Sequence, residues 1–267
     1  MPTDFIDFTR KDTLGVITLN RPEARNALTP EMVADLGQII VDCARPEIRA
    51  VMLTGTGGAF CAGADVKDFV DSLESGGPEA LSAHVQELAD SLHRNVIMGI
   101  RNLQKPVIAA VNGVAAGAGF SLALCCDMRV ASADARFIMA YAGIGCTADG
   151  GSTYMLPRLV GASKAMEIYM ASQPIGAEYA RELGLVNQVC PAEGFERHSL
   201  ETATRLAQGP TVAYGRVKSM FENSWGAGLE EQLAAETDAI SNIVFTSDFQ
   251  EGVKAFTQKR IPWFQGR

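Results

Sequence analysis

The sequence predicts a mixed α/β fold that becomes all-helical near residue 200. Two observations carry this prediction. Over residues 1–199, short apolar runs rich in β-branched residues alternate with stretches of helical periodicity, in a repeated strand–strand–helix order. From about Glu196 to the last residue, the apolar residues recur at helical spacing. We therefore expect a mixed core over residues 1–199 and a helical region over residues 200–267.

The first part of the chain predicts a hairpin, a helix, a strand and a long helix. Thr29-Pro30-Glu31 combines an N-cap residue, a proline at the first helical position and an acid in the first turn, so a helix begins there. Residues 70–79 are rich in Gly, Ser and acids and are expected to form a mobile loop. The predicted elements are strands at 4–9, 13–20 and 50–54, and helices from Thr29 to about Cys43 and over 80–103.

The stretch from Val107 to Asp127 is the centre of the predicted core. Residues 107–111 are an apolar, β-branched run that predicts a buried strand, and residues 120–126 are rich in Ala and Leu and predict a buried helix. Gly117-Ala118-Gly119 lies between them. A helix that begins at a turn of small residues presents unpaired backbone N–H groups to a ligand oxygen, so this turn predicts an anion or oxyanion site.

This stretch partly matches three known motifs. The dinucleotide fingerprint fails because Leu122 stands at its last glycine position, and the chain has no Gly-Lys-Ser/Thr of a P-loop. Gly119-Phe120-Ser121-Leu122-Ala123 nearly matches a nucleophile elbow, but His198 is the only histidine downstream. A serine hydrolase using Ser121 therefore stays open as an alternative.

After Asp127 the sequence predicts further strands and helices around an irregular glycine-rich segment at 142–151. A second turn of small residues, Ala59 to Lys67, precedes the loop at 70–79 and offers another free amide at Ala64, with Asp65 as the expected cap of the next element. The remaining predicted elements are strands at 128–131, 135–140 and 186–189 and helices at 152–159, 163–171 and 177–183.

Composition excludes several classes of function. The formal net charge of −8 argues against nucleic acid as a partner. No apolar run reaches the ~20 residues that a membrane span needs. The six cysteines form no C-x-x-C pair and the three histidines lie far apart, so we expect no metal site and reduced cysteines in a cytoplasmic protein.

Six segments spread over nearly the whole chain resemble the enoyl-CoA hydratase/isomerase family, also called the crotonase family. The resemblance implies a crotonase-like spiral of ββα units, a helical C-terminal region used in trimerisation, an acyl-CoA thioester as substrate and no separate cofactor. It also implies a homotrimer or a dimer of trimers. The segments are Leu19-Asn20-Arg21-Pro22 with Asn26-Ala27-Leu28, residues 60–67, residues 105–113, Cys126-Asp127, residues 157–161, and residues 180–186.

In that family two backbone N–H groups hold the thioester oxygen, and the resemblance places them at Ala64 and Ala118. Moving a proton at the carbon α to a thioester puts negative charge on its carbonyl oxygen. Two fixed N–H donors in a dry site stabilise this enolate, and each is worth about 3 kcal/mol.

The departure from the family lies in the acids. The resemblance places the two glutamates of the hydratases at Ser121 and Tyr141, which we expect to line the acyl pocket instead. It places Asp149 where isomerases and 4-chlorobenzoyl-CoA dehalogenase carry their single catalytic carboxylate, although locally Asp149 also suits a helix cap before Gly150-Gly151-Ser152. The dehalogenase histidine falls at Arg94, with His93 one step away, which disfavours a hydrolytic dehalogenase.

One carboxylate and an oxyanion hole suffice to shift a double bond, so the residues favour an isomerase. A hydratase of fatty-acid or aromatic-acid degradation, a hydrolase of acyl-CoA and a non-catalytic acyl-CoA binder remain alternatives. The basic residues that the resemblance assigns to coenzyme A would equally suit a solvated surface. The assigned residues are Ala24, Arg25, Ala62, Asp65, Val66, Lys67 and Lys259, with Arg260 beside the last.

Overall fold

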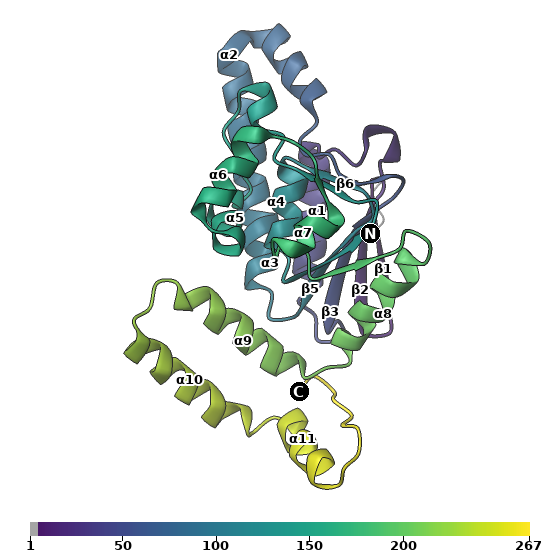
Figure 1. Ribbon diagram of the computed structural model, residues 1–267, viewed down its shortest axis with the longest axis vertical. Coiled ribbons are helices and arrows are strands. Elements are labelled where there is room, and N and C mark those ends of the chain that lie inside the picture. Colours follow the sequence, from purple (N-terminus) through teal and green to yellow (C-terminus); the bar gives the residue numbers. More distant parts are fainter. Residues whose placement is uncertain (1–4) are drawn as a thin grey trace.

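The computed structural model describes residues 5–267, and in this range the strands form two sheets (Figure 1). Residue 4 of the first predicted strand lies outside the described residues. The larger sheet has the order β1 (Ile6–Lys11), β2 (Leu14–Leu19), β3 (Ala50–Gly55), β5 (Val107–Val111), β7 (Met128–Ser132) and β10 (Gln188–Cys190). The smaller sheet has the order β4 (Ala59–Cys61), β6 (Val114–Ala116), β8 (Arg136–Ile138) and β9 (Ile175–Gly176).

The chain passes repeatedly from the larger sheet to the smaller one and then into a helix. β3 leads to β4, β5 to β6 and β7 to β8. In the larger sheet β3, β5 and β7 are parallel neighbours, and in the smaller sheet β4, β6 and β8 are parallel neighbours. The hairpin β1–β2 and the pair β8–β9 are antiparallel. This repetition confirms the predicted α/β fold of ββα units.

The helices cover both faces of the larger sheet. α8 packs on one face, where its Phe195 and Ala203 join Ile108 and Ala110 of β5 in one apolar cluster. The alternate residues of β5 face the main core with α1 and α4. All five residues of β5 and all eight of α4 are buried, which explains their unbroken apolar composition.

The helices within residues 5–267 are α1 (Pro30–Asp42), α2 (Val66–Ser91), α3 (Met98–Asn102), α4 (Ala118–Cys125), α5 (Ser152–Val160), α6 (Ala162–Ala171), α7 (Ala177–Glu182), α8 (Phe195–Ala207), α9 (Thr211–Ser224), α10 (Leu229–Ile243) and α11 (Ser247–Thr257). Shorter turns are η1 (Pro22–Ala24), the π-helical segment η2 (Leu92–Ile97) and η3 (Ala142–Ile144). As predicted, Thr29 caps α1 by accepting a hydrogen bond from Met32 N at 3.2 Å.

The predicted loop at 70–79 is wrong, because α2 begins at Val66 and passes through this segment. Asp65 caps the helix by accepting from Lys67 N at 3.1 Å. The helix breaks at Gly76 and Gly77, whose backbone angles are not helical, and this break produces the bend of α2 in Figure 1. Glycine and acidic residues therefore mark a bend between two helical halves rather than a loop.

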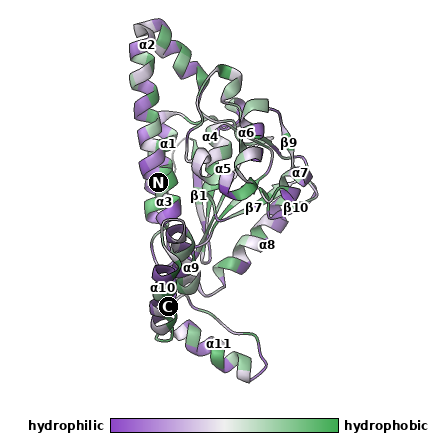
Figure 2. Cartoon of the chain, turned by 60° about the vertical axis from the view of Figure 1, so that its left-hand side comes forward, coloured by the Kyte–Doolittle hydropathy of each residue, from purple (hydrophilic) through white to green (hydrophobic). Residues whose placement is uncertain are grey.

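The C-terminal helices α9–α11 extend away from the two sheets (Figures 1 and 2). The boundary predicted between residues 199 and 200 falls inside α8, which packs on the larger sheet, so the extension begins at α9. Many of its apolar side chains are exposed, among them Phe221, Trp225, Leu229 and Phe245. No helix within residues 5–267 is both long and apolar enough to cross a bilayer.

Candidate active site

The two predicted turns of small residues meet backbone to backbone. A Cβ atom at Gly63 would lie 2.9 Å from Ala116 O and 3.3 Å from Ala118 N. A Cβ atom at Gly119 would lie 2.1 Å from Cys61 O. Both positions therefore need glycine, and their close approach places the turn that carries Ala64 beside the start of α4.

The amides of Ala64 and Ala118 are free of hydrogen bonds within the described residues. Ala118 is the first residue of α4, and the first backbone bond of this helix runs from Ser121 N to Gly117 O at 3.0 Å. Ala64 lies between Gly63, whose carbonyl accepts from Leu28 N, and Asp65, whose amide donates to Leu28 O. Two N–H groups thus remain for a ligand where the turns meet, and the positive end of α4 adds to their field.

Asp149 contacts Ser121, which lies one turn of α4 after Ala118. Ser121 Oγ is 2.9 Å from Asp149 O and 2.9 Å from Tyr141 Oη. Tyr141 Oη donates to Asp149 Oδ1 at 2.5 Å. No described residue donates a hydrogen bond to Asp149 Oδ2, and 34 % of this side chain is exposed, so one oxygen is anchored and the other is available.

The Tyr141 side chain that holds Asp149 is a neutral phenol. Burial, reinforced by the adjacent Asp149 carboxylate, raises the pKa of Tyr141 above its ordinary value, so the hydroxyl keeps the proton that it donates. Ser121 is fully buried and Tyr141 is nearly so, and both contact Asp149. Their expected place in an acyl pocket stays a prediction.

His93 belongs to this cluster, although the resemblance placed the dehalogenase histidine at Arg94 and His93 one step off around the helix. Its Nε2 accepts a hydrogen bond from Gly150 N at 3.0 Å and lies 3.9 Å from Asp149 Oδ2. The π-helical segment η2 is the reason, because a wider turn rotates the following side chains away from α-helical positions. Nothing in the local sequence marks such a turn.

Ser121 lacks the surroundings of a serine nucleophile. Its hydroxyl contacts Gly117 O, Tyr141 Oη and Asp149 O, and no histidine of the described chain bonds to it. His198 lies on α8 and bonds to Gln188 at 3.2 Å. The structure therefore does not favour the serine hydrolase alternative.

The residues expected to bind coenzyme A fall into two separate places. Ala62 N donates to Arg25 O at 3.0 Å, which brings Ala24-Arg25 against the turn before α2. Lys259 follows α11, at the opposite end of the molecule from α2 (Figure 1). Within one copy of the chain, Lys259 is therefore not brought together with the others.

Asp65 already has partners in the protein. Arg21 donates to its Oδ2 at 2.6 Å and Lys67 N donates to its Oδ1. Burial alone would raise the pKa of Asp65, but these hydrogen bonds outweigh burial and lower the pKa below its usual value. The exposed members of the set near α2 are Arg25, Val66 and Lys67.

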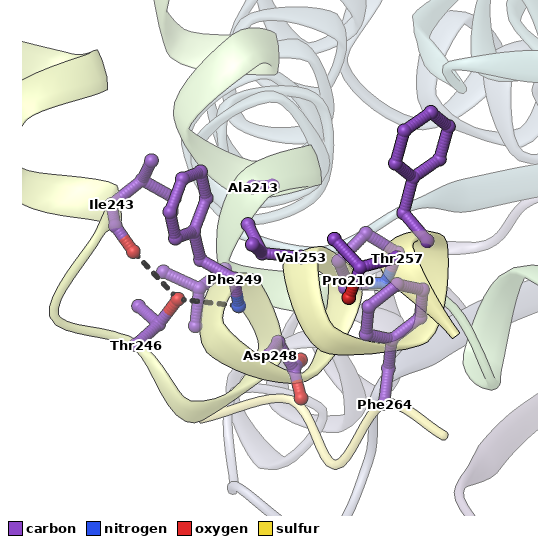
Figure 3. Close-up of a pocket in the computed structure, with 12 residues that line it drawn as sticks. Pro210, Ala213, Ile243, Thr246, Asp248, Phe249, Val253, Thr257 and Phe264 are labelled. Carbon is purple, nitrogen blue, oxygen red and sulfur yellow. Dashed lines mark hydrogen bonds between the residues drawn. The ribbon is translucent and has the colours of Figure 1, made fainter. Parts of the chain in front are cut away.

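Two apolar cavities flank different parts of the fold. One, of about 390 Å³, lies between α5, α6 and the segment that carries Asp149, with Ala148, Ser152, Leu156 and Tyr169 among its walls. The other lies between α9 and α11, where Thr246 bonds to Ile243 O and Phe249 N (Figure 3). Within residues 5–267, no three His, Cys, Asp or Glu side chains are arranged to hold a metal ion.

Comparison with known proteins shows the family to which the chain belongs. The family model described as "Enoyl-CoA hydratase/isomerase" matches residues 9–267. A Rhodobacter capsulatus protein named "Probable enoyl-CoA hydratase" is 40% identical over 95% of each chain. The Escherichia coli "1,2-epoxyphenylacetyl-CoA isomerase" is 38% identical over 94% of each. The crystal structure of an enoyl-CoA hydratase from Polaromonas sp. JS666 matches with a TM-score of 0.89 and 36% identity, covering 97% of this chain and 99% of that one. The chain belongs to the enoyl-CoA hydratase/isomerase family of acyl-CoA enzymes, the crotonase superfamily.

Proposed function

We propose that this chain is an enoyl-CoA isomerase in which Asp149 is the single general acid and base. The observation that carries the proposal is the hydrogen bonding of the two Asp149 carboxylate oxygens. Tyr141 anchors Oδ1 and no described residue bonds to Oδ2. The free amide of Ala118 lies one turn of α4 before Ser121, which contacts Asp149 O at 2.9 Å. The two positions to which the resemblance assigns the hydratase acids are Ser121 and Tyr141.

The proposed reaction moves one proton and consumes no water. Asp149 Oδ2 takes a proton from the α carbon of a 3-enoyl-CoA, the C–H bond breaks, and the electrons spread over the thioester as a dienolate. The amides of Ala64 and Ala118 hold the oxygen on which the charge develops. Asp149 returns the proton to the γ carbon, so the double bond ends between the α and β carbons, and no cofactor is needed.

The relatives support the class of reaction without choosing within it. The Escherichia coli protein carries the name of an isomerase, and the Rhodobacter capsulatus protein that of a probable hydratase. Hydration is the alternative. It requires a water molecule to be oriented and split. Beside Asp149 the described side chains are two neutral hydroxyls and His93, whose Nε2 already accepts a hydrogen bond from Gly150 N.

The test replaces Asp149 by asparagine, which keeps the shape and removes the base. We expect Asp149→Asn to lower kcat by about 10²–10⁴-fold while the affinity for the thioester stays within about threefold. Deuterium incorporation at the α carbon in heavy water reports the proton transfer, and mass spectrometry with chromatography separates shifted, hydrated and hydrolysed products.

Asp134→Asn is the matched control, because Asp134 is an exposed turn residue outside the cluster. An Asp149→Asn enzyme that exchanges the α proton at the wild-type rate contradicts the proposal. A wild-type enzyme that adds water to 2-enoyl-CoA, but leaves 3-enoyl-CoA unchanged, supports the hydratase instead.

We also propose that coenzyme A lies along Ala24-Arg25 and the turn from Ala62 through Asp65 and Val66 to Lys67, and that Lys259 joins it from another copy in a homotrimer. The exposed apolar side chains of α9 and α10 provide the surface for such packing. Light scattering at micromolar concentration tests this assembly, and a monodisperse species of about 28.5 kDa contradicts it.

A further inference from the structure

We infer that His93 is a positioning residue that holds the peptide unit between Asp149 and Gly150 and thereby orients the Asp149 carboxylate. The inference rests on the proposed role of Asp149 as acid and base. It concerns a histidine that neither the motifs nor the reaction scheme uses.

The peptide unit is held from both of its polar ends. Its carbonyl, Asp149 O, accepts from Ser152 Oγ at 2.7 Å and Ser152 N at 3.1 Å, with Ser121 Oγ at 2.9 Å. Its N–H, on Gly150, donates to His93 Nε2 at 3.0 Å. In a trans peptide the C=O and N–H point in opposite directions, so α5 and α4 hold one side and η2 holds the other.

The backbone at this point benefits from such support because two consecutive glycines restrict it least. Gly150 and Gly151 have φ values of +61° and +74°, and glycine gains no rigidity from a side chain. A Cβ at Gly150 would lie 2.6 Å from Ser121 Cβ, so glycine is required for the close approach. Without the bond to His93, one side of the peptide unit next to Asp149 would have no partner.

The same bond assigns the proton of the imidazole ring. Nε2 accepts from Gly150, so the neutral ring carries its hydrogen on Nδ1. The lone pair of Nε2 is thus engaged by a backbone amide and is not available to take a proton from a substrate or from water. The distance of 3.9 Å between His93 Nε2 and Asp149 Oδ2 is also longer than a hydrogen bond, so Oδ2 stays free.

The π-helical segment η2 delivers His93 to the cluster and turns its neighbour outward. Arg94, the next residue, has 78 % of its side chain exposed and pairs with Asp90 at the end of α2. The two positions therefore differ in what they face although they share one segment. Arg94 provides a matched control for substitutions at His93.

The experiment compares three variants in the isomerase assay. His93→Leu keeps apolar bulk and removes the acceptor, whereas His93→Gln supplies an amide oxygen that reaches about as far as Nε2. We expect His93→Leu to lower kcat by about 10- to 100-fold with KM within about threefold. We expect His93→Gln to retain kcat within about fivefold, and Arg94→Leu to match the wild type.

Hydrogen exchange at the Gly150 amide, resolved by fragmentation mass spectrometry, reads the same bond without turnover. We expect protection in the wild type and in His93→Gln, and faster exchange in His93→Leu. This readout separates the inference from the proposed function, because it stands even if the wild type shows no isomerase activity. If His93→Leu fails to fold, His93→Gln still decides: wild-type protection and near-wild-type kcat support the inference.

Two results overturn it. If His93→Gln loses as much kcat as His93→Leu while Gly150 stays protected, His93 transfers protons. If His93→Leu leaves both kcat and the exchange of Gly150 unchanged, the hydrogen bond does not hold the carboxylate.

Discussion

Gly119→Ala tests the meeting of the two turns more directly than any other single change. Gly119 follows Ala118 at the start of α4, and a methyl group there would lie 2.1 Å from Cys61 O and 2.7 Å from Cys61 Cβ. Cβ atoms essentially never approach a neighbour within 3.0 Å, so about 0.9 Å of separation is missing. The contact is with backbone, which has no rotamer to adopt instead.

The two segments must therefore move apart by a large part of that distance. Overpacking of this kind costs about 1–3 kcal/mol in the free energy of unfolding. Cys61 leads into the turn that carries Ala64, so the same movement separates the amides of Ala64 and Ala118. A displacement of about 1 Å in a catalytic group lowers kcat by about 10²-fold.

The assay measures α-deuterium exchange of the thioester together with urea unfolding. Gly58→Ala is the matched control, because a Cβ at Gly58 meets nothing within 4 Å and its φ lies outside the left-handed region. We expect this control to leave kcat unchanged and stability within about 1 kcal/mol. A Gly119→Ala enzyme that loses stability but keeps wild-type exchange would refute the role of the paired amides.

Three further predictions concern other contacts. Tyr141→Phe removes the donor to Asp149 Oδ1, and we expect kcat to fall by about 10- to 100-fold in the exchange assay with little change in KM, whereas unchanged kcat would show that the anchor is dispensable. Burial raises the pKa of Cys43 and Cys61 to about 12, so the stability that these thiols contribute is complete below the unfolded thiol pKa of about 8.5 and is lost as pH rises toward 12. Urea unfolding at several pH values should show this slope, and a Cys61→Ala variant should reduce it by the share of Cys61, whereas an unchanged slope would contradict the assignment. Lys218→Met removes the α9 ammonium that donates to Asp127 Oδ2 at 2.9 Å, while Asp127 keeps Val107 N at 2.8 Å and Arg101 at 3.7 Å, so we expect a loss of about 1–3 kcal/mol by urea unfolding, and unchanged stability would contradict it.

The parts of the fold that the sequence predicted are those with a regular signal. Val107–Val111 is an unbroken apolar run because both faces of β5 are covered, and Thr29-Pro30 marks the start of α1 by capping chemistry. The segment at 70–79 was mispredicted because Gly76-Gly77 is compatible with both a loop and a bend between helices. The choice depends on packing, including the edge contact of Phe69 with His84 across the bend.

The candidate site, like the fold, could be predicted only in part from the sequence. The turns at Ala64 and Ala118 are visible as small residues between a strand and a helix, and the structure brings them together through glycine contacts. The approach of His93 to Asp149 is not visible, because it depends on the π-helical turn of η2 and on an irregular segment whose shape no periodicity encodes.

The identities of Ser121 and Tyr141 acquire a physical reason from their contacts with Asp149. A glutamate at 121 would place a carboxylate, which can only accept hydrogen bonds, against Asp149 O and beside the Asp149 side chain. A glutamate at 141 would replace the neutral donor to Oδ1 with a second negative charge. The Asp149 carboxylate therefore depends on neutral side chains at positions 121 and 141. Introducing a glutamate at 121 alone would therefore repel Asp149 rather than add hydratase chemistry to it.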